Sequence, residues 1–157
     1  MLNQFEAQKL DVGWIVLASG SAGTHAGMLA GLHAAHSHIP VLGISVRQPK
    51  ERQISAVYRL AKSTAAQLTD MPLGIGSVQV DDGYVGDGYG LPTRGTFRAI
   101  DLAAKFEGLL LDPVYSAKGF DGMVSLIQNN FFKADKDVVF IHTGGSAALF
   151  AYETELV

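Results

Sequence analysis

The chain has 157 residues, of which 48% are hydrophobic and only 17% are charged, and it contains no cysteine. This composition excludes a disordered polypeptide, a disulfide framework and a thiolate metal cluster, and it predicts one globular domain spanning residues 1–157. The net charge of -3 argues against nucleic acid as a partner. The N-terminus does not resemble a secretory signal, and no apolar run is long enough to cross a bilayer, so we expect a cytoplasmic protein without a membrane partner.

The first half of the chain predicts alternating strands and helices. Residues 14–17 and 41–46 are short apolar runs typical of buried strands. A helix rich in Ala, Leu and Met is expected over residues 25–35, and a second over residues 50–68, where apolar residues recur at helical spacing. This order favours a parallel sheet covered by helices.

The second half continues the α/β pattern around glycine-rich loops. The expected elements are a strand at residues 78–81, a loop at 82–92, a helix at 94–106 capped by Thr93, a very short strand at 109–111, a helix at 119–128, a strand at 138–141 and a helical turn through Phe150. Together the two halves predict an α/β fold in three layers, an open parallel sheet with helices on both faces.

Three polar or glycine-rich segments, residues 20–24, 112–118 and 142–146, are expected at strand ends, where open α/β sheets bind ligands. The first has the composition of a phosphate loop: small residues let the backbone approach an anion, Ser21 and Thr24 offer hydroxyls, and a helix follows. It is neither a Walker loop nor a dinucleotide fingerprint. A strand-to-helix turn that binds no ligand is the alternative interpretation.

Metal chemistry has weaker support. The aspartates of the glycine-rich loop lack the spacing of a calcium site. Three histidines near the end of the first helix could converge on a metal, but such residues are more often solvated: His33, His36 and His38. No metal site is therefore expected.

Five segments of the sequence, taken in order, are typical of one enzyme family. They are residues 19–27 (SGSAGTHAG), 43–47 (GISVR), 88–93 (GYGLPT), 111–119 (LDPVYSAKG) and 141–145 (IHTGG). On these motifs the chain resembles the C-terminal half of the D-cysteine desulfhydrase and 1-aminocyclopropane-1-carboxylate (ACC) deaminase family, from about residue 11 to about residue 152. The resemblance implies the large domain of the tryptophan synthase β-like fold (fold type II) and pyridoxal 5'-phosphate as the cofactor.

The resemblance also implies which residues bind this cofactor. The expected set is Gly20, Ser21, Ala22, Gly23, Thr24, Ser116, Thr143 and Gly144. Ala22 stands where the family usually has glycine, which the loop tolerates if φ at this position is negative. Ser116 matches the position that faces the pyridine nitrogen, where the deaminase carries glutamate and desulfhydrase-like members carry a hydroxyl residue. A hydroxyl gives a weaker electron sink, so Ser116 favours the desulfhydrase reaction, the elimination of a thiol.

The expected catalytic residues are Tyr89 and Tyr115, which match tyrosines over the substrate and cofactor. The family's Schiff-base lysine lies in the N-terminal half, in a motif that this sequence lacks, and Lys118 matches a different lysine. The resemblance therefore implies half of a C–S lyase, which is inactive alone or needs an N-terminal partner half. A non-catalytic module that binds pyridoxal phosphate or phosphate, and a small enzyme in which another residue has taken a new role, are the alternatives.

The expected partners follow from the same resemblance. The substrate would be a small amino acid, converted by α,β-elimination to pyruvate and ammonia. A sheet without its second lobe exposes apolar surface and unpaired strand edges, and the low charged fraction agrees with such a surface. We therefore expect either a homo-oligomer, most simply a dimer, or an N-terminal half-enzyme as the protein partner.

Overall fold

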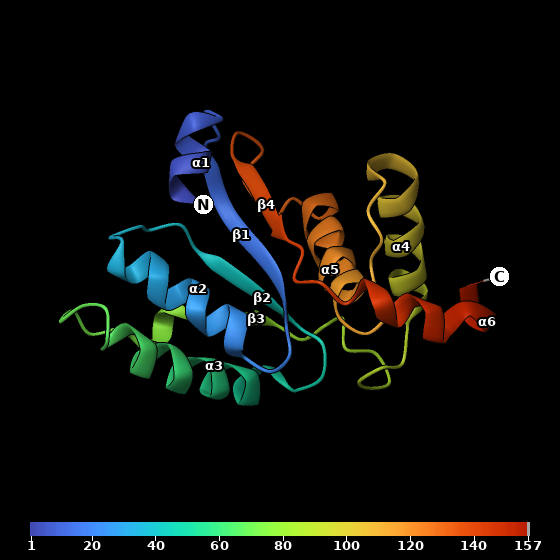
Figure 1. Cartoon of the computed structure of the whole chain (residues 1–157), viewed down its shortest axis with the longest axis horizontal. Helices are drawn as coiled ribbons and strands as arrows, with labels where there is room; N and C mark the ends of the chain where they lie inside the picture. The colour runs from blue at the N-terminus through green and yellow to red at the C-terminus, as the bar shows by residue number, and fades with distance from the viewer. Residues whose placement is uncertain (157) are drawn as a thin grey trace.

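The computed structural model describes residues 1–156 and contains a four-stranded sheet (Figure 1). The strands are β1 (Val12–Ser19), β2 (Val41–Ser45), β3 (Gln79–Asp81) and β4 (Asp137–Ile141), in the order β3-β2-β1-β4. Every strand pair is parallel, and β1 lies in the middle between β2 and β4. The predicted parallel α/β architecture is confirmed.

Helices cover both faces of this sheet (Figure 1). On one face, α2 (Gly23–Ala34) and α3 (Lys50–Ala65) pack against each other and against the strands. On the other face, α5 (Ser116–Gln128) contacts β1 and β2, and α4 (Arg94–Glu107) packs on α5. The shorter elements are α1 (Leu2–Ala7), η1 (Ile75–Ser77), η2 (Ser146–Tyr152) and α6 (Glu153–Leu156). None of the helices in the described part of the chain could span a bilayer.

The central strand explains why the sequence shows a continuous apolar run at this point. Successive side chains of a strand point to opposite faces, and both faces of β1 are covered. Ile15 and Leu17 belong to the core cluster under α2 and α3, whereas Val16 belongs to the cluster under α5. All three side chains are 0% exposed. The middle of the sheet is therefore fully buried, and the loops that follow its strands begin from this packed core.

The predicted strand at residues 109–111 is wrong. Leu109 and Leu110 are 42% and 54% exposed, and the segment is an irregular stretch after Gly108, whose φ of 64° ends α4. The carbonyl oxygen of Leu110 accepts hydrogen bonds from Ser146 Oγ at 2.7 Å and from His142 Nε2 at 3.2 Å. The side chains of Ser146 and His142 thus use the carbonyl group of Leu110, which in a strand would accept a hydrogen bond from a neighbouring strand.

The helix boundaries differ from the predictions by a few residues. The predicted cap at Thr93 is confirmed, because Thr93 Oγ1 accepts from Thr96 N and Thr96 Oγ1 accepts from Thr93 N, a capping box. The helix expected from residue 119 begins at Ser116, whose N–H donates to the Asp112 carboxylate at 2.9 Å. The short helix α1 was not predicted.

Candidate cofactor site

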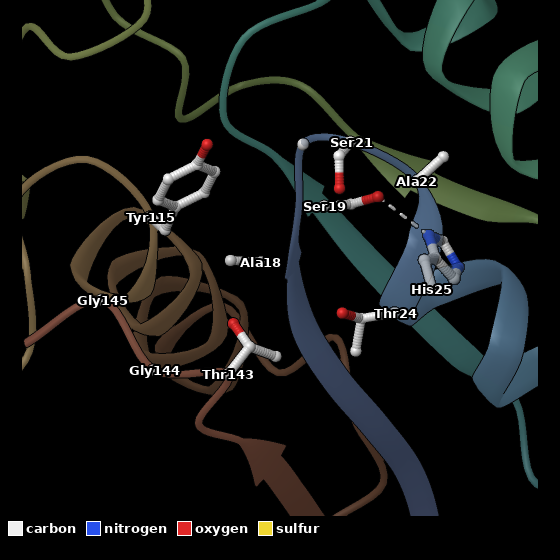
Figure 2. A pocket seen from close by; sticks show the side chains of 11 residues that line it. Ala18, Ser19, Ser21, Ala22, Thr24, His25, Tyr115, Thr143, Gly144 and Gly145 are labelled. Carbon is white, nitrogen blue, oxygen red and sulfur yellow. Dashed lines mark hydrogen bonds between the residues drawn. The ribbon is translucent and has the colours of Figure 1, made fainter.

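A cavity of about 230 Å³ opens at the carboxyl ends of β1 and β4 (Figure 2). It combines parts of the three segments singled out in the sequence, residues 20–24, 112–118 and 142–146, of which the first and last directly follow strands. Figure 2 shows Tyr115 and Thr143 on one side of the end of β1 and Ser21 and Thr24 on the other. The lining residues are Ala18, Ser19, Gly20, Ser21, Ala22, Thr24, His25, Tyr115, Thr143, Gly144 and Gly145.

The loop after β1 leads into the N-terminus of α2. The first hydrogen bond of this helix runs from Ala26 N–H to the Ala22 carbonyl, at 2.8 Å. The amides of Thr24 and His25 therefore have no acceptor within the helix, and no side chain caps them. With the positive end of the helix dipole and two nearby hydroxyl groups, this arrangement suits a phosphate group.

Ala22 adopts a left-handed conformation, with φ 70° and ψ -19°, so the condition of a negative φ, under which the loop would tolerate alanine, is not met. This region costs a non-glycine residue about 1–2 kcal/mol. The side chain is only 5% exposed and packs in the core under α2. The loop thus keeps the conformation that glycine adopts without strain, even though the residue at this position is alanine.

Two glycines let the three segments approach one another. A β-carbon at position 20 would lie 2.9 Å from Tyr115 Cε1 and 3.1 Å from Val46 Cγ2. At position 145, where φ is 96°, a β-carbon would overlap the Asp112 carboxylate. Only residues without a side chain allow the backbone to pass this close, so Gly20 and Gly145 fix the width of the cavity.

Beneath the loop lies a buried polar cluster that joins two residues of the 19–27 motif, Ser19 and His25, to Gln53 of α3. Gln53 Nε2 donates to Ser19 Oγ at 2.8 Å, and Ser19 Oγ lies 3.1 Å from His25 Nδ1 (Figure 2). Burial lowers the pKa of His25 to about 4, a shift that the backbone of Val41 partly opposes. The imidazole is therefore neutral at pH 7 and adds no charge to the cavity wall. The sequence analysis missed Gln53, whose only signal is a polar residue on the apolar face of α3.

Tyr89 does not line the cavity but lies against Tyr115, which does. The two phenol oxygens are hydrogen-bonded, and the rings pack edge-to-face with centroids 5.5 Å apart. The Arg47 guanidinium lies 5.4 Å from the centroid of the Tyr89 ring. The hydrogen bond with Tyr115, followed by burial, raises the pKa of Tyr89 to about 12. Tyr89 is therefore protonated at neutral pH.

Ser116 is fully buried and is not among the lining residues. Its Oγ donates to Asp112 Oδ1 at 2.5 Å and accepts from the Asp112 N–H at 2.8 Å. A hydroxyl group has a single proton, so in this arrangement Ser116 has none left for another acceptor. Gly23 also lies outside the lining. The structure thus brings together the other predicted cofactor residues: Gly20, Ser21, Ala22, Thr24, Thr143 and Gly144.

Within residues 1–156, no lysine lines the cavity. Lys118, the lysine nearest in sequence to Tyr115, is 1% exposed and donates to the carbonyls of Val85 and Gly88. Its amine is therefore engaged with the glycine-rich loop. Among the described residues there is also no group of three His, Asp or Glu side chains that could hold a metal ion.

Residues 1–144 match the sequence model of the family described as "Pyridoxal-phosphate dependent enzyme". The chain belongs to this family. It is 38% identical over 146 residues to D-cysteine desulfhydrase of Salmonella paratyphi C and 39% identical over 138 residues to that of Salmonella newport. These alignments cover 93% and 88% of this chain but 44% and 42% of the relatives, so the chain spans less than half of their length.

Solved structures give the same assignment. The crystal structure of an ACC deaminase homologue superposes with a TM-score of 0.83 at 31% identity, and it covers 99% of this chain and 46% of that one. The fold is that of a fold type II pyridoxal-phosphate enzyme, and the similarity is to the C-terminal part of this family. The resemblance found in the motifs is thus confirmed.

The family implies pyridoxal 5'-phosphate as the cofactor, and the residues present fit its phosphate group. The amides at the start of α2 are without helix acceptors, and Ser21 and Thr24 add hydroxyl donors at the cavity. The left-handed backbone at Ala22 forms part of this concave loop.

Proposed function

We propose that the chain is the cofactor-binding part of a pyridoxal-phosphate-dependent lyase of the D-cysteine desulfhydrase type. In this proposal the chain is one domain that corresponds to the C-terminal half of the family. The supporting observation is the cavity in which the N-terminus of α2, Tyr115 and residues 143–145 meet. When bound, the cofactor supplies an electron-withdrawing ring that stabilises negative charge on the carbon atom of an amino acid substrate.

Each segment of the cavity has its own task in this proposal. The loop Gly20, Ser21, Ala22, Gly23 and Thr24 binds the phosphate through backbone amides and hydroxyl groups. Tyr115, Thr143 and Gly144 flank the ring. Tyr89 fixes the orientation of the Tyr115 phenol through the hydrogen bond between the two hydroxyl groups, and its raised pKa keeps it protonated at neutral pH.

The absence of a lysine from the described lining leads to the second part of the proposal. Covalent attachment of the cofactor and release of product both need a primary amine at the ring. We therefore propose that the chain turns over substrate only together with a polypeptide that supplies this lysine, such as an N-terminal half-enzyme. The substrate would be a small amino acid such as D-cysteine, which gives pyruvate, ammonia and sulfide.

Calorimetry with pyridoxal 5'-phosphate tests the binding step. We expect heat of binding with pyridoxal 5'-phosphate and much weaker binding with pyridoxal, which has the same ring but no phosphate. Equal affinity for the two compounds, or no heat and no spectral change at millimolar concentration, would contradict the assignment of the loop.

Sulfide release from D-cysteine tests the catalytic step. The chain alone should be inactive, and addition of the N-terminal half of a D-cysteine desulfhydrase should restore sulfide release. Activity of the chain alone would show that an amine of this polypeptide does reach the cofactor.

A second candidate function, a homo-oligomeric assembly module, has support from the surface. Phe106 and Phe150 are 75% and 77% exposed, and in the described part of the chain β4 pairs only with β1. Large exposed apolar side chains and unpaired strand edges are typical of surfaces that bind another chain. Light scattering at micromolar concentration tests this candidate, which a stable monomer would exclude.

A further inference from the structure

Lys118 is a buried cation that the proposed function does not use. It lies in the first turn of α5, three residues after Tyr115, and its side chain is 1% exposed. A buried ammonium group is stable only if hydrogen bonds replace its water shell. The Nζ donates to the carbonyl oxygens of Val85 at 2.6 Å and Gly88 at 2.8 Å. The ammonium group is thus hydrogen-bonded to the backbone of a different segment, the glycine-rich loop at residues 82–92.

This segment, residues 82–92, has no regular secondary structure of its own. Gly86, Gly88 and Gly90 have φ angles of 67°, 155° and 76°, which side-chain-bearing residues rarely adopt. A chain with so many glycines has high conformational entropy when it is free, so it needs external contacts to hold one shape. Lys118 makes two of these contacts, and Tyr152 Oη makes another to the Gly90 carbonyl at 2.8 Å.

Tyr89 lies between these anchored positions. The Lys118 contact at Gly88 precedes it by one residue, and the Tyr152 contact at Gly90 follows it by one. Its side chain is 47% exposed, and its ring interacts with Tyr115 and Arg47 but is not enclosed by the core. Its position against Tyr115 therefore depends on the backbone on either side.

We propose that Lys118 is a positioning residue, whose ammonium group holds the loop at residues 85–88 and thereby keeps Tyr89 against Tyr115 at the edge of the cavity. A charged donor gives the short, strong hydrogen bonds observed here, and one ammonium group can serve two carbonyls at once. Burial lowers the pKa of Lys118, and the electrostatic attraction of Asp87 on the same loop opposes this shift. The inference rests on the proposed function only in that the proposed function gives the pair Tyr89 and Tyr115 a role at the cofactor. The test of the inference needs no cofactor.

Fluorine NMR of the full chain labelled with 3-fluorotyrosine measures the effect directly. Resonances are assigned with single Tyr→Phe variants, and each tyrosine is titrated in the unaltered chain, in Lys118→Met and in Lys105→Met. Lys105 is the matched control because it is exposed and pairs only with Asp101. In the unaltered chain the fluorotyrosine at position 89 should titrate well above free 3-fluorotyrosine, because the hydrogen bond with Tyr115 and burial raise the pKa of Tyr89.

In Lys118→Met we expect the titration of Tyr89 to fall by up to about two pH units, toward that of free 3-fluorotyrosine, because the hydrogen bond with Tyr115 is lost. Hydrogen exchange of the amides at residues 85–90 should become roughly tenfold faster or more. Lys105→Met should change neither quantity. An unchanged Tyr89 titration in folded Lys118→Met would overturn the proposal, whatever the chain's affinity for pyridoxal phosphate.

The unaltered chain keeps the proposal testable if Lys118→Met does not fold. The ammonium protons of Lys118 should exchange with water far more slowly than those of Lys105 in nitrogen-15 NMR spectra, since they are buried and bonded to carbonyls. Ammonium protons that exchange as fast as those of Lys105 would overturn the inference. Lys118→Arg, which keeps the charge, should retain more of the Tyr89 shift than Lys118→Met.

Discussion

The ring of Tyr115 lies directly against Gly20, so that a β-carbon at position 20 would come within 2.9 Å of Tyr115 Cε1. The contact joins the start of α5 to the loop after β1, two segments from opposite faces of the sheet. It sets the separation between the proposed phosphate loop and Tyr115, the tyrosine proposed to flank the cofactor ring.

Gly20→Ala should therefore weaken the binding of pyridoxal 5'-phosphate by roughly tenfold, because Tyr115 must shift into the cavity. Gly27→Ala is the matched control, since a β-carbon there would have no neighbour within 4 Å. It should leave the affinity unchanged and stabilise α2 by up to about 1 kcal/mol. Calorimetry and urea unfolding of both variants measure these effects, and equal affinities would contradict the role of the contact.

The strained conformation of Ala22 predicts an asymmetry between this alanine, which precedes α2, and Ala26 within the helix. Ala22→Gly loses a buried methyl group, worth about 0.8 kcal/mol, but it relieves left-handed strain, so its net effect on the free energy of unfolding should be small. Ala26→Gly, in a helix interior and 0% exposed, should cost about 2 kcal/mol. Urea unfolding measures the free energy of unfolding of both variants. Equal losses of this free energy would show that the backbone at Ala22 is not strained.

His25 predicts a loss of stability in mild acid. Burial lowers the pKa of His25 from 6.5 to about 4. Between these two values the unfolded chain binds a proton at this histidine and the folded chain does not. The free energy of unfolding should fall by about 2 to 3 kcal/mol from this residue as the pH drops from about 7.5 to about 4.5. His25→Gln should lack this component, whereas the exposed control His38→Gln should keep it. Urea unfolding at both pH values gives the comparison.

Asp112 predicts a large effect from a small chemical change. Its carboxylate accepts the N–H groups of Val114, Tyr115 and Ser116 and also the Ser116 hydroxyl. Asp112→Asn places an amide donor against these donors and should cost about 3 kcal/mol. It should also lower the affinity for pyridoxal 5'-phosphate, since Tyr115 loses its anchor.

The control for this variant is Asp101→Asn, which removes only an exposed pair with Lys105. It should cost less than about 0.5 kcal/mol and leave the affinity unchanged. Thermal unfolding and calorimetry provide both readouts. Similar losses in the two variants would mean that the bonds of Asp112 do not hold the start of α5.

The strands and the loop at residues 20–24 could be predicted because local composition determines them. An apolar run that is covered on both sides has to be a central strand, and small residues before a helix have few alternatives to a tight turn. The strand predicted at residues 109–111 was wrong because three apolar residues in a row do not indicate whether the backbone pairs with another strand. Here the Leu110 carbonyl bonds to Ser146 and His142.

The polar contacts of the site could not be predicted because they join residues far apart in sequence. Gln53 reaches Ser19 across 34 positions, and Lys118 reaches Val85 across 33. No periodicity or motif contains such distances. Similarly, Ser116 was expected at the cofactor ring by resemblance, and only the folded chain shows that its proton is donated to Asp112.

The cavity draws on both ends of the polypeptide, since β4 must pair with β1 before residues 143–145 can meet the loop at residues 20–24. The hydrogen bond between Asp11 N and Asp137 Oδ2 spans 126 positions, so the closure of this pair is among the most non-local events in folding. A molecule seated in the cavity would tie the first strand to the last one. Such a ligand should therefore stabilise the folded chain as a whole and raise its resistance to proteolysis at sites that the ligand does not contact.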